Sequence, residues 1–226
     1  MGKRNNEIGL LKRGTSNLER IKPKLAVRET ILIVCEGKNT EPSYFEKFKK
    51  SSVEIEVEGT GSNTVSVVKK AKQLEKRKIY AQIWCVFDAD PKPSNPNQAK
   101  NFNEAITLAK KNGFGVAYSN QAFEYWFILH FEDHQGGKMP RTDYNKKIND
   151  YLKPYNIIYD GKGSKIVTDH FFDVLNAVDR KTGKDRVDLA IRRAEKIYNN
   201  CKNLSPAKRE SSTAVFKLVK ELQKYT

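Results

Sequence analysis

The fold is decided by residues 30–41, which read Thr30-Ile31-Leu32-Ile33-Val34-Cys35-Glu36-Gly37-Lys38-Asn39-Thr40-Glu41. Five successive apolar residues, mostly β-branched, are too few for a helix and lack the alternation of a half-exposed strand. They predict a strand buried on both faces. Gly37 permits the sharp turn that must follow, and Asn39 or Thr40 can cap a helix after it. Glu36 is therefore expected at the carboxyl end of an inner strand, where open α/β sheets bind ligands.

A second apolar run ends in two more acids. Residues 83–91 read Ile83-Trp84-Cys85-Val86-Phe87-Asp88-Ala89-Asp90-Pro91. While the chain stays extended, Asp88 and Asp90 point to the same side, and a parallel neighbouring strand about 4.8 Å away would bring Glu36 beside them. Three carboxylates gathered there would repel one another unless a cation lay between them, and hard oxygen ligands suit Mg²⁺ or Mn²⁺. The sequence therefore predicts a metal site formed by Glu36, Asp88 and Asp90.

Alternating strand and helix patterns predict an α/β fold. The strict alternation at 53–59 predicts an edge strand with one solvent-facing side, and the short apolar stretch at 114–118 predicts a fourth strand. Residues with helical spacing separate the strands. This order implies right-handed crossovers and a mainly parallel four-stranded sheet flanked by helices. The helices expected within this core begin near residue 40 and cover residues 63–79 and 98–111.

Three parts are expected along the chain. Residues 1–28 form a basic arm, residues 29–120 the α/β core, and residues 121–226 an all-helical extension packed on the core. The arm carries eight Lys or Arg against two Glu, a composition typical of a flexible segment that an anionic partner orders, or of a solvated tail. Apolar spacing predicts further helices at 119–131, 142–152, 164–178, 185–200 and 212–224.

Bulk composition narrows the function classes. The 226 residues carry a formal net charge of +15, which favours binding to polyanions such as nucleic acid, although lysine-rich chains are sometimes only more soluble. No segment approaches the roughly 20 apolar residues of a membrane span. No apolar segment follows the basic N-terminus, so no secretory signal is visible. Three scattered cysteines without a CxxC pair indicate a reducing compartment, so a cytoplasmic protein is expected.

One carboxylate stands out in the apolar segment 119–131. Glu124 is its only charged residue before the end of the helix expected there. A lone buried carboxylate costs several kcal/mol unless it binds a cation, pairs with a base or stays protonated. Glu124 is therefore a candidate site residue, with a structural hydrogen bond as the alternative.

Other local patterns lack the spacing that their chemistry needs. His130 and His134 stand four apart, but the acid between them is one place too late for a zinc-protease motif. The segments 37–40 and 161–164 contain Gly-Lys pairs without the full spacing of a phosphate-binding P-loop. Neither pattern predicts a site.

A glutamate after the first strand, a DxD after a later strand and the alternating frame resemble the Toprim fold of topoisomerases, primases and OLD-type nucleases. Three local patterns, which together span most of the chain, are VCEGKNTEPSYF at 34–45, SNQAFEYWFILHF at 119–131 and SSTAVFKLV at 211–219. They are similar to those of RloB-like proteins, which are associated with bacterial abortive-infection systems. Gln121 and Ser211 stand where the family pattern looks like Pro, and both departures fall on turn residues.

The resemblance implies a cytoplasmic metal-dependent nuclease that a partner ATPase holds in check until phage infection. Carried over onto this sequence, Glu36, Asp88 and Asp90 correspond to the Toprim acids. Glu124 corresponds to the carboxylate of the second RloB pattern. By analogy with related defence effectors, the substrate is RNA, including tRNA, or DNA.

The chemistry expected of such a site is phosphodiester hydrolysis with Mg²⁺ or Mn²⁺. Glu41 or Glu124 would complete the metal shell or take a proton. Lys38 would offset charge on the phosphate, unless it is only a solvated loop lysine. Two alternatives stay open: a non-catalytic nucleic-acid-binding subunit of a defence complex, and nucleotidyl transfer of the primase kind.

Overall fold

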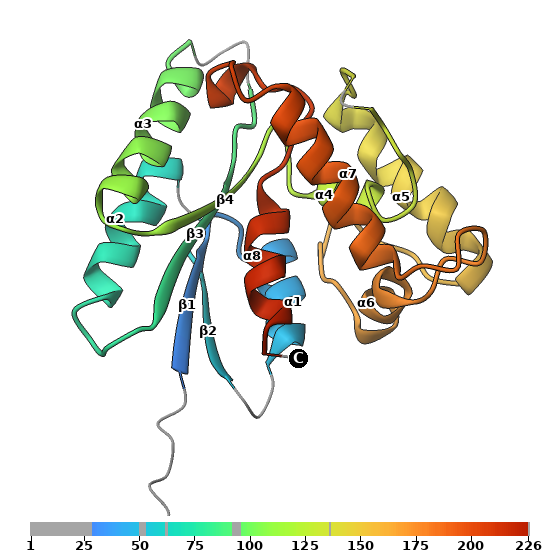
Figure 1. The fold of residues 1–226 in the computed structure, drawn as a ribbon, viewed down its shortest axis with the longest axis horizontal. Coiled ribbons are helices and arrows are strands. Elements are labelled where there is room, and N and C mark those ends of the chain that lie inside the picture. The colour runs from blue at the N-terminus through green and yellow to red at the C-terminus, as the bar shows by residue number, and fades with distance from the viewer. Residues whose placement is uncertain (1–28, 50–52, 62, 92–95, 136, 226) are drawn as a thin grey trace, which may run out of the picture.

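The computed structural model shows an α/β fold built on one parallel sheet (Figure 1). The basic arm predicted for residues 1–28 lies outside the described residues. Those are residues 29–49, 53–61, 63–91, 96–135 and 137–225.

The sheet contains four strands in the order β2-β1-β3-β4, all parallel. β1 lies between β2 and β3, which confirms the inner position predicted for it, and β2 lies at one edge. β4 follows β3 at the other edge. The fold class predicted from the sequence, a parallel four-stranded sheet flanked by helices, is thus confirmed. The strands are β1 (Glu29–Cys35), β2 (Val53–Gly59), β3 (Gln82–Asp88) and β4 (Gly115–Ser119).

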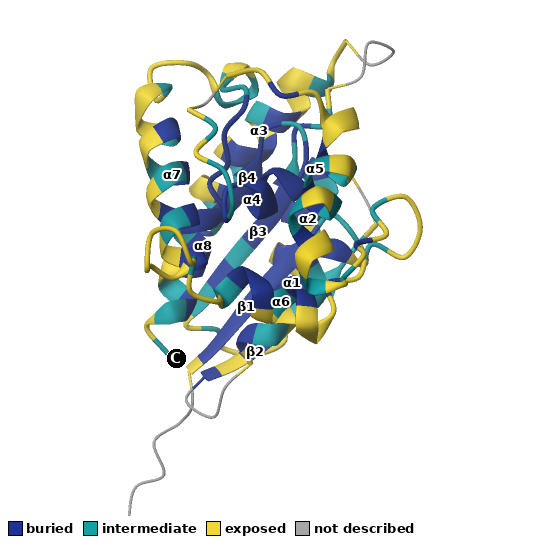
Figure 2. Ribbon diagram, turned by 90° about the vertical axis from the view of Figure 1, so that its right-hand side faces the viewer, coloured by how far each residue is buried: buried dark blue, intermediate teal, exposed yellow. Residues whose placement is uncertain are grey.

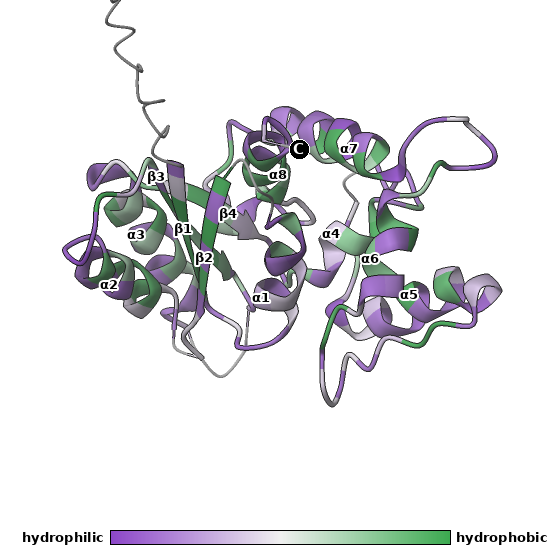
Figure 3. Ribbon diagram, turned by 90° about the horizontal axis from the view of Figure 1, so that it is seen from below, coloured by the Kyte–Doolittle hydropathy of each residue, from purple (hydrophilic) through white to green (hydrophobic). Residues whose placement is uncertain are grey.

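Both faces of the sheet are covered, which explains the uninterrupted apolar run of β1. Ile31 and Ile33 enter one hydrophobic cluster with α1 and α8, while Leu32 and Val34 enter a second cluster with α2 and α3. All four side chains are fully buried. Figure 3 shows the apolar strands between these two helical layers, whose outward sides are hydrophilic. The covering helices are α1 (Thr40–Phe45), α2 (Thr64–Leu74), α3 (Gln98–Lys111) and α8 (Val215–Gln223).

The apolar segment 119–131 holds only a short helix, α4 (Glu124–Ile128). Its first residues belong to the strand end and a loop instead. The N–H of Asn120 donates to the carbonyl of Ser212 (2.8 Å), and Gln121 has a left-handed φ of 80°. Since residues 122–129 are buried on every side, their apolar character reflects packing and not helix length.

The remaining helices form a group beside the sheet, and in Figure 2 their outer sides are exposed. α6 begins later than predicted because Thr168 caps it, accepting a hydrogen bond from the N–H of Phe171 (3.2 Å). No helix in the described part of the chain has both the length and the apolar character needed to cross a lipid bilayer. These helices are α5 (Tyr144–Leu152), α6 (Asp169–Asn176) and α7 (Arg186–Asn200), and short 3-10 turns occupy Glu46–Phe48, Arg141–Asp143, Lys153–Tyr155 and Pro206–Lys208.

Candidate metal centre

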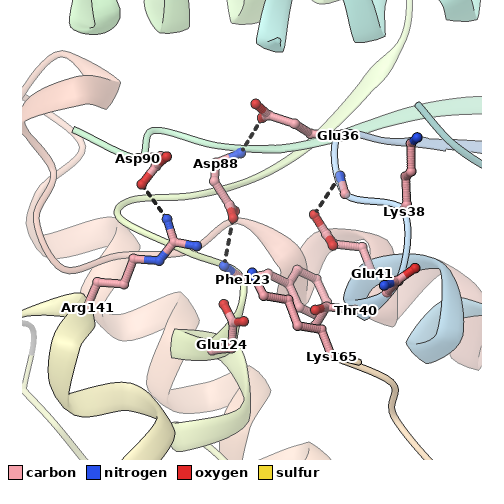
Figure 4. Close-up of a pocket in the computed structure, with 12 residues that line it drawn as sticks. Glu36, Lys38, Thr40, Glu41, Asp88, Asp90, Phe123, Glu124, Arg141 and Lys165 are labelled. Atoms are coloured by element: carbon pink, nitrogen blue, oxygen red, sulfur yellow. Dashed lines mark hydrogen bonds and ion pairs between the residues drawn. The ribbon is translucent and has the colours of Figure 1, made fainter. Parts of the chain in front are cut away.

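A polar pocket of about 220 Å³ opens at the carboxyl ends of β1 and β3 (Figure 4). This is the edge at which open α/β sheets bind ligands. All six residues predicted from the sequence as catalytic line it. The pocket is lined by Glu36, Gly37, Lys38, Asn39, Thr40, Glu41, Asp88, Asp90, Phe123, Glu124, Arg141 and Lys165.

The loop after β1 is shaped by two glycines. The N–H of Gly37 donates to Oε1 of Glu41 (3.2 Å), and a Cβ on Gly37 would lie 2.2 Å from Oε2 of the same carboxylate. Gly59, at the end of β2, approaches the loop backbone so closely that its Cβ would lie 2.8 Å from the carbonyl oxygen of Gly37. The loop therefore holds the carboxylate of Glu41 against the loop backbone, at the carboxyl edge of the sheet.

Asp88, the last residue of β3, is the central acid of the pocket. Its N–H donates to Oε2 of Glu36 (3.1 Å), and its Oδ2 accepts a hydrogen bond from the N–H of Phe123 (3.1 Å). Its Oδ1 is fully enclosed and has no hydrogen-bond partner among the described residues. Because a buried carboxylate oxygen without a partner is costly, this atom is the feature of the pocket that a bound cation would satisfy.

Asp90 reaches the pocket by a different route from the one predicted. The strand ends at Asp88, and Asp90 has a left-handed φ of 35°, so the two side chains are not related by an extended backbone. The carboxylate of Asp90 forms an ion pair with Arg141. Figure 4 shows Asp90 turned toward Arg141 while the side chain of Asp88 points toward Phe123 and Glu124.

The three predicted ligands thus line one pocket, but they are not arranged around a single metal position. Glu36 reaches the main chain of Asp88, and Asp90 pairs with a cation. Among the residues that the structure describes, no group of three His, Cys, Asp or Glu side chains is arranged to hold a metal ion. For all three to hold one ion, Asp90 would have to leave its ion pair with Arg141.

Two further acids face Asp88 from the helical side. Glu41 and Glu124 are 5% and 8% exposed and lie at the starts of α1 and α4. The hydroxyl of Tyr159 donates to Oε1 of Glu124 (3.1 Å) and lies 3.2 Å from Oγ1 of Thr40. Glu124 therefore has the structural hydrogen bond that the sequence left as an alternative, and it also lines the pocket.

Burial and mutual repulsion perturb these acids. Burial, followed by repulsion from Glu41, Glu124 and Glu36, raises the pKa of Asp88 well above its usual range, and Arg141 opposes the shift only in part. Burial also raises the pKa of Glu41, with repulsion from Glu124 adding to it. The acids lie close enough together to resist ionising at the same time.

Three cations complete the lining: Lys38, Arg141 and Lys165. Against five acids they leave a formal excess of two negative charges, which a divalent cation would balance. Lys38 was predicted from its place beside Glu36, whereas Arg141 and Lys165 were missed. Lys165 comes directly after the Gly-Lys segment 161–164, a signal that could have pointed to it, but nothing in the local sequence marks Arg141.

The donor set fits Mg²⁺ or Mn²⁺. Both ions prefer carboxylate oxygens, and both tolerate a shell completed by water or phosphate. The unpartnered Oδ1 of Asp88 and the raised pKa of that group are the features that a bound divalent cation would relieve.

The fold and the pocket define the class: an α/β protein with an acid-rich pocket at the carboxyl edge of a parallel sheet. A family model described as RloB-like protein matches residues 31–222. The chain therefore belongs to the RloB-like family. No curated protein and no solved structure matches it.

Proposed function

We propose that this chain is a Mg²⁺- or Mn²⁺-dependent nuclease that hydrolyses phosphodiester bonds, with a Toprim-like arrangement of acids. One observation carries the proposal: five carboxylates and three cations line one pocket at the strand ends, and its central acid has a buried oxygen without a partner. A divalent ion bound there would polarise the phosphoryl oxygen and lower the pKa of a bound water.

The acids divide into two groups by position. Asp88 is the central ligand, flanked by Glu36 and Asp90 from the strand ends. Glu41 and Glu124 face it from α1 and α4, and repulsion from both raises the pKa of Asp88. A carboxylate with a raised pKa is suited to hold a proton near neutral pH, so Glu41, whose pKa burial raises, is the candidate to take a proton from the attacking water.

The remaining pocket groups would hold the substrate in place. The guanidinium of Arg141 can accommodate a phosphate beside its ion pair with Asp90, because it has five N–H donors. Lys165 and the exposed Lys38 supply two further positive charges. The hydrogen bond from Tyr159 fixes the carboxylate of Glu124, which keeps that acid oriented toward the pocket.

The family match supports a setting in bacterial defence. In that setting the chain would act in the cytoplasm as an anti-phage abortive-infection effector controlled by a partner ATPase. Its substrate would be nucleic acid, either RNA, including tRNA, or DNA, in keeping with the formal charge of +15.

Replacing the central acid tests the proposal. Asp88→Asn keeps the shape and removes the charge, so we expect cleavage of RNA or DNA in Mn²⁺ to fall by at least about a hundredfold. The matched control is Asp173→Asn, an exposed acid of α6, which should retain full activity. Unchanged metal-dependent cleavage by a folded Asp88→Asn protein would refute the assignment.

The second candidate is a non-catalytic nucleic-acid-binding subunit of a defence complex. The observation that favours it is the ion pair of Asp90 with Arg141, which neutralises one predicted ligand. Incubating the protein with tRNA, total RNA and DNA, in Mn²⁺ and in EDTA, separates the two. Metal-dependent products support the nuclease, whereas binding without products in either condition supports the binding subunit.

A further inference from the structure

A second cavity lies along the free edge of the sheet, away from the acids. It has a volume of about 260 Å³ and runs along β4, with α3 on one side and α7 and α8 on the other. No residue lines both this cavity and the acidic pocket. Figure 3 shows α3 and α8 on opposite sides of the sheet at this edge. We call this cavity the β4 cleft.

Aromatic side chains form the walls of the β4 cleft. They come from three separate elements: Trp84 from β3, Phe114 and Tyr118 from the β4 segment, and Tyr198 from α7. The indole of Trp84 lies flat against Gly115, whose absent Cβ would be only 2.4 Å from the ring. The glycine therefore creates the space in which this half-buried ring packs. Phe114 and Tyr118 are buried, whereas Trp84 and Tyr198 are half-buried and keep part of their surface accessible. Accessible aromatic faces can serve as platforms for nucleobases.

The lining of the β4 cleft carries a net positive charge. Its lining contains Lys110, Arg209 and Lys217 and no carboxylate. The ammonium of Lys217 lies 4.0 Å from the centre of the Tyr198 ring, and the guanidinium carbon of Arg209 lies 5.2 Å from it. Although burial raises the pKa of the Tyr198 phenol, hydrogen bonding from Lys217 and Arg209 outweighs it and lowers that pKa. Both cations therefore act on the same ring.

One of the cations is fixed and two are available. Arg209 donates to the carbonyls of Leu204 and Lys202 and to the hydroxyl of Tyr118 at 2.8, 2.7 and 3.1 Å. It is held rigidly by the wall. Lys110 is exposed on α3 and forms no ion pair among the described residues, and Lys217 lies over the rings of Tyr198 and Phe216 and hydrogen-bonds to Tyr198. These two lysines can turn toward an anion.

We propose that the β4 cleft is a second nucleic-acid contact that takes one nucleotide unit, with the base against the aromatic walls and the phosphate on Lys110 and Lys217. Flat aromatic walls and cations together match a base that carries a phosphate, whereas a bare anion would need only the cations. The volume of about 260 Å³ lies just below the usual range of small-ligand sites, which begins at about 300 Å³, so the cleft has room for no more than one such unit. The inference extends the proposed function but does not require cleavage.

Tryptophan fluorescence provides a test of base binding in the cleft. The chain contains two, and Trp126 is fully buried while Trp84 lines the cleft. In EDTA, where cleavage cannot occur, we expect a single-stranded oligonucleotide of about eight residues to quench Trp84 fluorescence saturably. Trp84→Phe keeps an aromatic ring and should abolish the signal. A titration without saturable quenching would overturn the proposal.

Charge reversal tests the phosphate contact. Lys110→Glu and Lys217→Glu should each weaken oligonucleotide binding about tenfold and reduce the slope of log affinity against log salt by about 0.7. The control is Lys111→Glu, the next residue of α3, which is exposed and lies outside the cleft. If Lys111→Glu weakens binding as much as Lys110→Glu, the oligonucleotide is attracted to the basic surface as a whole and not to the cleft, and the proposal is wrong.

Competing ligands identify the source of the nucleotide. A nucleoside monophosphate that binds as tightly as the oligonucleotide supports a free nucleotide, and tighter oligonucleotide binding supports a strand. Inorganic phosphate that competes as well as the monophosphate would overturn the role of the base. Cleft binding is read in EDTA from the fluorescence of Trp84, and cleavage is read separately in Mn²⁺, so loss of cleavage and loss of cleft binding are separate results.

Discussion

At the scale of single residues, the buried ionisable side chains have the largest effects on protonation and stability. Asp88 and Glu41 are buried and lie among other acids, so the fold favours their neutral forms. His130 is buried for a different reason. It follows α4 in the chain and is 1% exposed. Its Nδ1 is 2.9 Å from the carbonyl oxygen of Trp126, and its Nε2 is enclosed without a hydrogen-bond partner in the described part of the chain.

His130 should make the protein acid-sensitive. Burial lowers its pKa from 6.5 to about 3, so the folded chain keeps it neutral while the unfolded chain binds a proton below about pH 6.5. Stability is thus complete above that pH and is lost as the pH falls toward 3. At about 1.4 kcal/mol per pKa unit, roughly 2–3 kcal/mol is lost by about pH 4.5.

Urea unfolding at neutral and acidic pH measures this loss. His130→Asn should shrink the difference between the two free energies of unfolding, whatever it does to stability at neutral pH. The control is His170→Asn, an exposed histidine of α6, which should leave the difference unchanged. An equal acid loss in all three proteins would contradict the account of His130.

At the scale of elements, the β1 and β3 strands could be predicted because apolar runs covered on both faces leave a distinctive pattern. The structure of segment 119–131 could not be predicted, because its backbone hydrogen-bonds to residues that are distant in the sequence. Asn120 bonds to Ser212, and Asp90 bonds to the carbonyl of Gln121. Such long-range bonds override local spacing, which by itself predicted a longer helix.

The contact between the β1 loop and the end of β2 yields an element-scale prediction. A Cβ at Gly59 would meet the carbonyl oxygen of Gly37 at 2.8 Å and Cα of Lys38 at 2.9 Å, and backbone atoms cannot move aside cheaply. Gly59→Ala should therefore destabilise the protein by about 1–3 kcal/mol and reduce cleavage, because the loop carries Lys38 and holds the carboxylate of Glu41.

Gly137→Ala is the matched control for this change. A Cβ there would have open space within 4 Å, so stability and cleavage should both stay within error of the unmodified protein. Thermal unfolding and the cleavage assay measure the pair. Equal stability of the two alanine variants would show that the loop and β2 are not packed as described.

At the scale of the whole molecule, the sheet places two unlike surfaces at two of its edges. The acidic pocket lies at the carboxyl ends of β1 and β3, and the β4 cleft lies along the free side of β4. Sequence position predicted the acids, because strand ends converge in parallel sheets. It could not predict Arg141 and Lys165, which reach the pocket from distant segments whose placement depends on tertiary packing.

Metal binding should stabilise the whole fold. At a Mn²⁺ concentration about 100-fold above Kd, linkage adds about 2.7 kcal/mol. For a chain of this size that raises Tm by roughly 5–10 °C relative to EDTA. Asp88→Asn should lose most of this rise, whereas Asp173→Asn should keep it. A rise of the same size in Asp88→Asn would place the ion elsewhere.

A crystal soaked in Mn²⁺ tests the central claim most directly, because anomalous scattering locates the ion without reference to activity. We expect an anomalous peak in the acidic pocket, in contact with Asp88 and at least one of Glu36, Asp90, Glu41 and Glu124. A saturating soak that leaves Asp90 paired with Arg141 and shows no ion touching Asp88 would contradict it.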